Sequence, residues 1–575
     1  MPPGVVGAPG RPNGLAGSPR VSGWRERLRR SPFGAGRLRA YWLSGPGIVM
    51  LLATALAVAI RLFTLSRSGY LIGITEYDDG VYLGAALRMT EGAMPYKDFA
   101  FIQPPGILLL MTPVALIAKI TTTVKALALA RLLTALASAA CVPLAGNLVR
   151  YRGTVVTLVT CGVLAIYPAD VATAHTLMLE PWMNLFCLLG INAAFRRGHL
   201  ARPGHLVWAG LALGLAGAIK FWAAAPAAVL LACCVAVRQD RARRVRDYLL
   251  GLAAGFVIPI APFLTAAPLT FLRGTITDQA VRTGSSVPIG VRLANLTGLI
   301  DILDTKGGIS LNAGAHSMFA AGASAGLPGS SGVGWLPAAA TVALVAVIAV
   351  GYAWQSRRLT QLEWLSLVTT VLAAAAVLGY SAFFYHYADF LAPWLALTLG
   401  GAAGALAWRP RRPGRPGRPA LRTVVPIAVS AAILMVAALQ IRETFPLQQS
   451  SGQAMAHLIP KGSCVVTDEA SLTIAADRFA DLPPGCPDIV DSLAATLVLS
   501  NGVSVQGGAD HMPQVVAAWK AWLDRADYVW LSPGHGSARR IPWTPGLVAW
   551  FNATFAKLGA YRAGTGQLYV RVAPR

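Results

Sequence analysis

Residues 46–65 read PGIVMLLATALAVAIRLFTL, and residues 75–82, which follow shortly after, read TEYDDGVY. The first stretch has the length and apolar composition of a helix that crosses the hydrocarbon core of a bilayer. The second places two adjacent acids just beyond the end of that helix. The rest of the chain has the same character, because 55% of its 575 residues are hydrophobic and only 13% are charged. This composition excludes an ordinary soluble protein and predicts a membrane protein.

Ten further apolar stretches are long enough, or nearly so, to cross the membrane. They cover residues 126–148, 154–168, 181–195, 206–219, 221–237, 248–266, 335–354, 362–379, 388–408 and 421–440. With the first stretch they predict eleven transmembrane helices. Residues 106–120 are also apolar, but only one crossing fits between an outer first loop and the basic Arg150 and Arg152, which belong inside. We therefore expect 106–120, which follows Pro104 and Pro105, to be a juxtamembrane helix in the outer interface.

Basic residues give the chain a formal net charge of +24. In a soluble protein this would suggest nucleic acid binding, but here the arginines cluster in short segments between apolar stretches, which marks the cytoplasmic face. We therefore expect a multi-pass protein of the plasma membrane with a cytoplasmic N-terminus, and no nucleic acid partner. The segments expected outside are 66–125, 169–180, 267–334, 380–387 and the C-terminal part.

The expected fold class is mainly α: a polytopic helical membrane protein of about eleven transmembrane helices, with juxtamembrane helices and a small C-terminal α/β domain. Residues 1–45 are expected to form a disordered basic cytoplasmic tail, 46–442 the transmembrane domain, and 443–575 an extracytoplasmic domain. In that last domain, strand-like runs lie at 463–467, 528–531 and 568–572, and amphipathic helical stretches at 514–526 and 547–558.

The seven cysteines predict no metal site. Five of them lie in apolar stretches, where cysteine behaves as a small hydrophobic residue. Cys464 and Cys486 lie in the polar C-terminal part, where an extracytoplasmic location would allow a disulfide between them. Two unpaired thiols agree with the sequence equally well.

Three carboxylates on the outer side are candidate catalytic groups. Adjacent acids such as Asp78 and Asp79 repel each other, which raises the pKa of one of them and produces a general base. The same pair would also suit the first turn of a helix, where acids favour the positive end of the dipole. Glu180 begins an apolar stretch at the bilayer edge, where an acid is costly unless it faces a cavity or a partner. Its alternative role is to cap the helix ahead of Pro181.

Cations and a histidine are expected on the same side. Lys220, Arg131 and Arg292 lie at outer ends of apolar stretches or in the outer loop, where each could extend toward lipid headgroups or bind a phosphate. His386 could hydrogen-bond a phosphate or have a structural role at a helix end. Tyr387 next to it also suits an interfacial aromatic belt. The location of these residues on one side of the membrane favours a phosphate-binding site, because a lipid phosphate leaving group needs positive charge nearby.

In combination these features resemble the GT-C superfamily, the membrane glycosyltransferases that use polyprenyl-phosphate sugars and include the protein O-mannosyltransferases and the aminoarabinose transferases of lipid A. The features that carry the resemblance are Asp78-Asp79, Tyr96-Lys97-Asp98-Phe99, Gln103-Pro104-Pro105-Gly106, Arg131, Leu179-Glu180-Pro181 and His386-Tyr387. No single motif is specific, but their order and their shared side of the membrane are. The resemblance covers residues 46 to about 440.

The resemblance implies roles for these residues. It makes Asp78 the catalytic base with Asp79 in support, and Glu180 joins them as a candidate catalytic residue. The candidate substrate-binding residues are Lys220, Arg131, Arg292, His386, Tyr387 and Gln103. The family often carries a basic residue beside the double proline, where this chain has Gln103 and Gly106. The cation that binds the donor phosphate is therefore left open.

The expected reaction follows from the position of the candidate residues on the extracytoplasmic side of the membrane. Nucleotide sugars are cytoplasmic, so an enzyme that works outside needs a sugar carried on a polyprenyl phosphate. We expect a mannose-type or arabinose-type sugar to move, with inversion, to a hydroxyl of a glycan, lipid or protein acceptor in envelope synthesis. No cofactor is expected beyond this donor, no metal site is predicted, and a need for a divalent metal is left open.

Two other classes of protein compete with this interpretation. One is a multi-span transporter or flippase of an envelope precursor, since buried charges and many spans also describe a substrate pathway. The other is a non-catalytic envelope assembly protein, which would leave the paired acids unexplained. The crowding of ionisable residues on one face of the membrane favours the transferase.

Overall fold

The computed structural model describes a large part of the chain. The described residues are 42–281, 287, 289–298, 336–354, 358–380, 383–407, 419–444, 452–480, 482–532, 536–558 and 566–574. The predicted tail, apart from residues 42–45, and most of the outer loop expected at 267–334 lie outside these residues.

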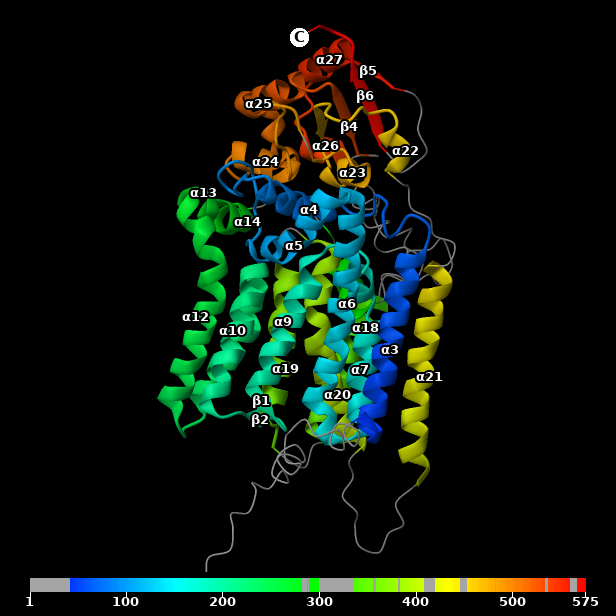
Figure 1. Cartoon of the computed structure of the whole chain (residues 1–575). Helices are drawn as coiled ribbons and strands as arrows, with labels where there is room; N and C mark the ends of the chain where they lie inside the picture. Colours follow the sequence, from blue (N-terminus) through cyan, green and yellow to red (C-terminus); the bar gives the residue numbers. More distant parts are fainter. Residues whose placement is uncertain are drawn as a thin grey trace, which may run out of the picture.

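Upright helices stand side by side in the lower part of the molecule (Figure 1). They are α3 (Gly45–Ser66), α6 (Thr123–Val149), α7 (Thr154–Ile166), α9 (Leu179–Ala194), α10 (Pro203–Ile219), α11 (Ala224–Ala236), α12 (Arg241–Ala266), α18 (Leu336–Ala353), α19 (Gln361–Gly379), α20 (Ala392–Ala407) and α21 (Pro419–Thr444). Each apolar stretch that the sequence predicts to cross the membrane coincides with one of them. Among the described residues, five helices are long and apolar enough to cross a membrane. They lie at 45–66, 123–152, 241–266, 361–379 and 424–442, and the total number of crossings stays a prediction.

Helices α10 and α12 pack more closely than ordinary side chains allow. A Cβ atom on Gly251 of α12 would lie 2.0 Å from the carbonyl oxygen of Val207, and one on Gly255 would lie 2.1 Å from that of Leu211. Across the contact, a Cβ atom on Gly210 or Gly214 of α10 would meet the backbone of α12. Paired small residues four apart let the two backbones approach, which is a common basis of helix association in membranes.

Short helices cover the upper end of this bundle (Figure 1). The most important for the site are α4 (Tyr77–Thr90), α5 (Gly106–Ile120), α8 (Pro168–Thr173), α15 (Ile289–Thr297) and the 3₁₀ segment η4 (Tyr385–Leu391). Helix α5 has the bounds expected of the juxtamembrane helix, and it lies between the upright helices and the C-terminal domain. The remaining pieces of this layer are η2 (Phe221–Ala223), α13 (Pro268–Leu272), η3 (Arg273–Thr277) and α14 (Asp278–Val281).

At the lower end, η1 (Arg150–Arg152) joins α6 to α7, and strands β1 (Phe195–Arg196) and β2 (His199–Leu200) form a small antiparallel hairpin. Arg152 makes an ion pair with Glu363 at the start of α19. This end of the bundle therefore carries the predicted basic segments around residues 150 and 196, away from the C-terminal domain (Figure 1).

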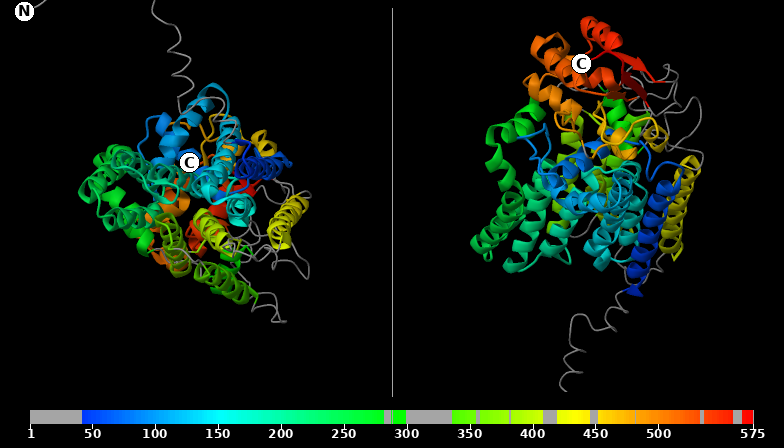
Figure 2. Two further views of the ribbon diagram at one scale, coloured as in Figure 1. Left: turned by 90° about the horizontal axis from the view of Figure 1, so that it is seen from below. Right: turned by 45° about the horizontal axis from the view of Figure 1, so that its top comes forward.

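The C-terminal residues form a separate layer above α4 (Figure 2). Its sheet has the order β3-β4-β6-β5, with β3 (Val465–Thr467) parallel to β4 (Tyr528–Leu531) and the other neighbours antiparallel. Strand β6 (Gln567–Arg571) lies between β4 and β5 (Phe555–Lys557), so β3 and β5 are the edge strands. The helices of the domain are α22 (Gln453–Ala456), α23 (Ala470–Ala475), α24 (Ser492–Leu499), α25 (Pro513–Asp524), α26 (Gly536–Arg540) and α27 (Pro545–Thr554), with 3₁₀ turns η5 (Val505–Gly507) and η6 (Ala509–His511). Cys464 and Cys486 are joined by a disulfide.

One boundary in this domain differs from the sequence prediction. The helical stretch expected over 547–558 ends at Thr554, and residues 555–557 continue as strand β5. The reason is tertiary, because Phe555, Ala556 and Lys557 pair with β6 and complete the edge of the sheet. Hydrophobic periodicity alone does not reveal that pairing.

We predict that Gly251→Ala destabilises the protein because the new methyl group must displace the backbone of α10. The expected loss is about 1–3 kcal/mol. The measurement is thermal unfolding of the purified protein in detergent, followed by tryptophan fluorescence. Gly204→Ala is the matched control, since a Cβ atom at Gly204 has no neighbour within 4 Å. Equal melting temperatures for the two variants would contradict the close packing of α10 on α12.

Candidate active site

The two adjacent acids of the first outer loop have different surroundings. Both lie in the first turn of α4, where the helix dipole favours negative charge, and the Glu76 side chain accepts a hydrogen bond from the Tyr77 N–H as the helix cap. Asp79 is fully buried, whereas Asp78 is partly exposed. The resemblance makes Asp78 the base with Asp79 in support, and in the structure the two acids differ in their burial.

Asp79 is enclosed by hydrogen-bond donors. One carboxylate oxygen lies 2.6 Å from Nη2 of Arg131 and 3.0 Å from the hydroxyl of Thr75. The other oxygen accepts the backbone N–H of Leu177. Hydrogen bonds from these donors occupy both carboxylate oxygens and leave Asp79 enclosed by protein groups.

Arg131 is as buried as Asp79. Besides Asp79 and Thr75, it donates to the carbonyl oxygens of Tyr70 at 2.8 Å and Gly73 at 2.9 Å. The sequence analysis grouped Arg131 with the substrate-binding cations, but the structure surrounds it with protein acceptors. In this arrangement Arg131 fastens the outer loop at residues 70–79 to α6 and thereby positions the start of α4.

Asp78 differs because the described residues supply its carboxylate with no hydrogen bond or ion pair. Burial raises the pKa of Asp78 above the ordinary value of an aspartate, and the nearby charges of Asp491 and Glu180 raise it further. His386 and Lys220 act in the opposite direction. Asp78 therefore faces a group of charged residues and has the properties of a general base.

Glu180 connects Lys220 and His386. It is fully buried in the first turn of α9. One of its oxygens accepts a hydrogen bond from Nζ of Lys220 and lies 2.8 Å from Nδ1 of His386. The sequence analysis treated Glu180 as a catalytic candidate, and the geometry shows what it touches: it holds Lys220 and His386 side by side.

Aromatic rings surround Lys220. The chain is extended at Lys220, between α10 and the short segment η2. Its ammonium nitrogen lies 4.8 Å from the ring centre of Trp222 and 4.5 Å from that of Tyr387, and these two rings pack edge to face. Cation–π contacts of this kind stabilise a desolvated ammonium group without neutralising its charge.

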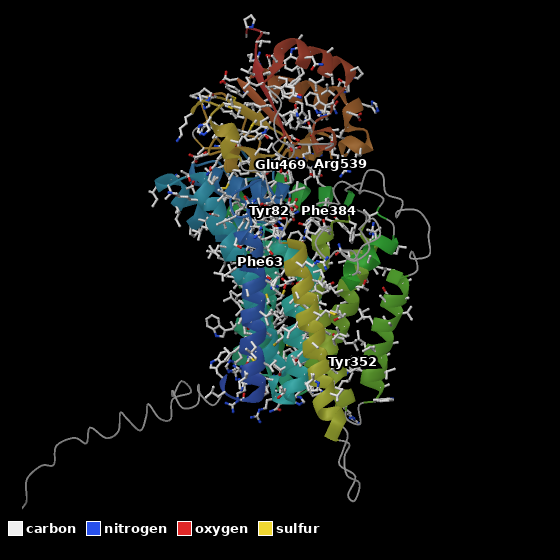
Figure 3. All side chains as sticks on the ribbon, turned by 90° about the vertical axis from the view of Figure 1, so that its right-hand side faces the viewer. Phe63, Tyr82, Tyr352, Phe384, Glu469 and Arg539 are labelled. Carbon is white, nitrogen blue, oxygen red and sulfur yellow. A yellow bond between two sulfur atoms is a disulfide. The ribbon has the colours of Figure 1, made fainter. Side chains whose placement is uncertain are left out.

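Tyr82 is a residue of this site that sequence reasoning missed. It is buried, and the raised pKa of its hydroxyl has burial as the first cause, followed by the charges of Asp78, Glu180 and Asp491. Figure 3 shows Tyr82 and Phe384 at the level where the bundle meets the C-terminal domain, with Glu469 above them. The signal was in the sequence, because Tyr82 follows Asp78 by four residues and so lies on the same face of a helix.

Gln103 and Arg292 lie farther from Asp78. Gln103 is partly exposed just before α5, and its backbone carbonyl accepts the hydroxyl of Tyr96. Arg292 donates to the carbonyl oxygens of Leu378 and Tyr380 at the end of α19. Within the described part of the chain, neither side chain contacts Asp78 or Glu180. The same described residues hold no group of three or more His, Cys, Asp or Glu side chains arranged for a metal ion.

The architecture is similar to solved membrane glycosyltransferases. One is ArnT from Cupriavidus metallidurans bound to undecaprenyl phosphate, at a TM-score of 0.53 and 15% identity over 91% of this chain and 98% of that chain. Another is the archaeal oligosaccharyltransferase AglB from Archaeoglobus fulgidus in complex with an inhibitory peptide and a dolichol-phosphate. Its TM-score is 0.52 and its sequence identity is 12%, over 93% of this chain and 74% of that chain. No protein-family model matches the chain, and no curated protein does. These structural neighbours belong to the GT-C superfamily, so the predicted GT-C resemblance is confirmed at the level of the fold.

We predict that Arg131→Met destabilises the protein by about 3–5 kcal/mol, because it leaves the Asp79 carboxylate buried without a counter-charge. The double variant Asp79→Asn/Arg131→Met removes that charge as well and should recover part of the loss. Folded yield and melting temperature in detergent report both effects. Lys125→Met is the control, since Lys125 is an exposed cation on the same helix. An Arg131→Met protein as stable as this control would contradict the positioning role of Arg131.

Proposed function

We propose that this chain, which has the fold of the GT-C glycosyltransferases, transfers a sugar from a polyprenyl-phosphate donor to an acceptor hydroxyl on the extracytoplasmic side. The observation that carries the proposal is the contrast among three acids. Asp79 is held by Arg131 and Glu180 by Lys220 and His386, while Asp78 is partly exposed and faces Lys220 and His386. A base that is open to substrate and lies beside a lysine and a histidine suits the displacement of a phosphate by a hydroxyl group.

In the proposed step, Asp78 accepts the proton of the acceptor hydroxyl as its oxygen attacks the anomeric carbon. The new C–O bond forms while the bond from that carbon to the lipid phosphate oxygen breaks, and the lipid phosphate leaves with the bonding electrons. Attack and departure on opposite faces of the sugar invert the configuration of the anomeric carbon. The raised pKa of Asp78 favours proton transfer, because a stronger base takes up the developing proton more readily.

Lys220 is the proposed ligand of the donor phosphate, with His386 beside it. Both share one carboxylate oxygen of Glu180, so a single acid positions the two side chains that an approaching phosphate meets. The charge that develops on the leaving phosphate would be stabilised by the ammonium group of Lys220. Trp222 and Tyr387 lie together beside Lys220 and supply apolar ring faces suited to the sugar ring or the first prenyl units.

Three observations support the extracytoplasmic side. The C-terminal domain lies at the same end of the bundle as Asp78, and it carries the Cys464–Cys486 disulfide, which persists in oxidising compartments. Clusters of arginine belong to the opposite end. The acceptor is proposed as a hydroxyl of a glycan, lipid or protein of the envelope, and the sugar as one of mannose or arabinose type.

We predict that Asp78→Asn lowers sugar transfer at least about a hundredfold while the protein remains folded, since an amide does not accept the proton. The assay incubates purified protein with polyprenyl-phosphate mannose and arabinose and follows the release of the lipid phosphate. Asp98→Asn serves as the control, because Asp98 is an exposed acid of the same outer segment. A wild-type rate in Asp78→Asn would exclude it as the base. The absence of donor consumption by the wild type would favour a flippase or an assembly protein.

We predict that Lys220→Met lowers kcat/KM for the donor about tenfold to a hundredfold, because one charge-assisted contact to the phosphate is lost. Lys220→Arg should restore part of the activity, since arginine keeps the charge and can still reach Glu180 and a phosphate. Steady-state kinetics over a range of donor concentrations measure both effects. Lys97→Met, which changes an exposed lysine of the outer segment, is the control. A donor kcat/KM in Lys220→Met that equals the control would show that another cation binds the phosphate.

A further inference from the structure

The first residue of α4 is bound by the C-terminal domain. The hydroxyl of Tyr77 donates to the Asp491 carboxylate at 2.7 Å and accepts the backbone N–H of Leu493 at 3.1 Å. The hydroxyl of Ser492 lies 3.2 Å from the same oxygen. Three consecutive residues at the start of α24 therefore contact the hydroxyl group of Tyr77, the residue that directly precedes Asp78 in the sequence.

Arg540 covers the ring of the same tyrosine. Its guanidinium carbon lies 3.9 Å from the centre of the Tyr77 ring. Arg540 is itself held by Glu469 at 2.9 Å and by Asp468 at 3.5 Å, and Asp468 also accepts the backbone N–H of Ser532 at the end of β4. The cation over Tyr77 is thus anchored to the ends of the neighbouring strands β3 and β4. Its two acidic partners raise the pKa of Arg540, so it stays charged.

The contact continues along α4. A Cβ atom on Gly80 would lie 2.1 Å from the backbone nitrogen of Ser471, so only glycine lets α4 approach α23 this closely. Farther on, Arg88 makes an ion pair with Asp488 at 2.6 Å and donates to the carbonyl oxygen of Phe479 at 2.8 Å. The helix that carries the proposed base therefore packs on the C-terminal domain over its whole length.

We propose that the C-terminal domain is a working part of the transfer site: Asp491 and Arg540 hold Tyr77, and through Tyr77 they fix the position of the Asp78 carboxylate. Tyr77, Asp491 and Arg540 are positioning residues in this proposal, which rests on the proposed function of Asp78. The alternative is an interface that only stabilises the protein. Such an interface would affect folding but would leave the kinetics of correctly folded molecules unchanged.

The proposal also implies an electrostatic effect on Asp78. The groups that face it are His386, Lys220 and Glu180 from the bundle and Asp491 from the C-terminal domain, with Glu76, Asp79 and Tyr82 on or beside its own helix. The negative charge of Asp491 raises the pKa of Asp78. In Asp491→Asn that pKa should fall, and because the base works when deprotonated, the acidic limb of the pH–rate profile should move to lower pH.

The experiment uses the full chain in lipid nanodiscs with the donor that the wild type consumes. Tyr77→Phe keeps the ring under Arg540 and removes the hydroxyl. We therefore expect kcat to fall about tenfold, while the donor KM stays within about twofold of the wild-type value.

Asp491→Asn should lower kcat by a similar factor and shift the acidic limb of the pH–rate profile to lower pH. The double variant should be no slower than the worse single variant, since both changes break one contact. Tyr569→Phe, a hydroxyl loss elsewhere in the domain, is the control.

Hydrogen exchange provides a readout that does not depend on activity. In Tyr77→Phe the amides at the start of α4 should exchange faster than in the wild type, while those of α10 should be unchanged. Unchanged exchange at α4, additive rate losses, or a Tyr77→Phe rate equal to that of Tyr569→Phe would overturn the proposal while the wild type remains active. If the wild type consumes no donor, the proposed function fails first, before any variant is compared.

Discussion

The buried ion pair between Asp79 and Arg131 is the interaction on which the site depends. Two charges without exposure are costly to bury unless they neutralise each other and their remaining hydrogen-bonding groups are satisfied. Here Thr75, Leu177 and two carbonyl groups bond the carboxylate and the Nη groups, only Nε of Arg131 in this pair is left without a partner among the described residues, and the loop before α4 is held in place as a result. Because Asp79 points into the protein, the preceding residue, Asp78, points in a different direction, about 100° away around the axis of α4.

The same principle applies to the other acids of the bundle. Asp170 pairs with Arg61 at 2.5 Å, and Glu180 pairs with Lys220 and His386. Each of these carboxylates has a cation within contact distance in a region of low dielectric. Asp389, also buried in the bundle, has no ion pair among the described residues but accepts hydrogen bonds from Thr173 and Asn184. Asp78 has neither an ion pair nor a hydrogen bond there, and this difference makes it the reactive group of the proposed mechanism.

Much of the bundle was predictable because its helices are continuous apolar stretches, which a bilayer requires to satisfy the backbone hydrogen bonds within each segment. The shared side of Asp78, Glu180, Lys220 and His386 followed from the alternation of basic segments, and the structure places these four residues in one group. The residue pattern by itself could not separate Asp78 from Asp79, and the family resemblance alone gave them different roles, because the two acids differ in what folds against them. The hydrogen-bond partners of Tyr77 could not be predicted from the sequence either, since Asp491 is 414 residues away and belongs to another layer of the molecule.

That separation has a consequence for biosynthesis. A contact between the loop after α3 and a domain near the C-terminus forms only when nearly the whole chain has been made and the last domain has folded. Until then the Asp79–Arg131 pair holds the start of α4 without the support that Asp491 and Arg540 give to Tyr77. Under the proposed function, truncated molecules are therefore expected to be inactive, and the donor is consumed only after the whole chain has folded.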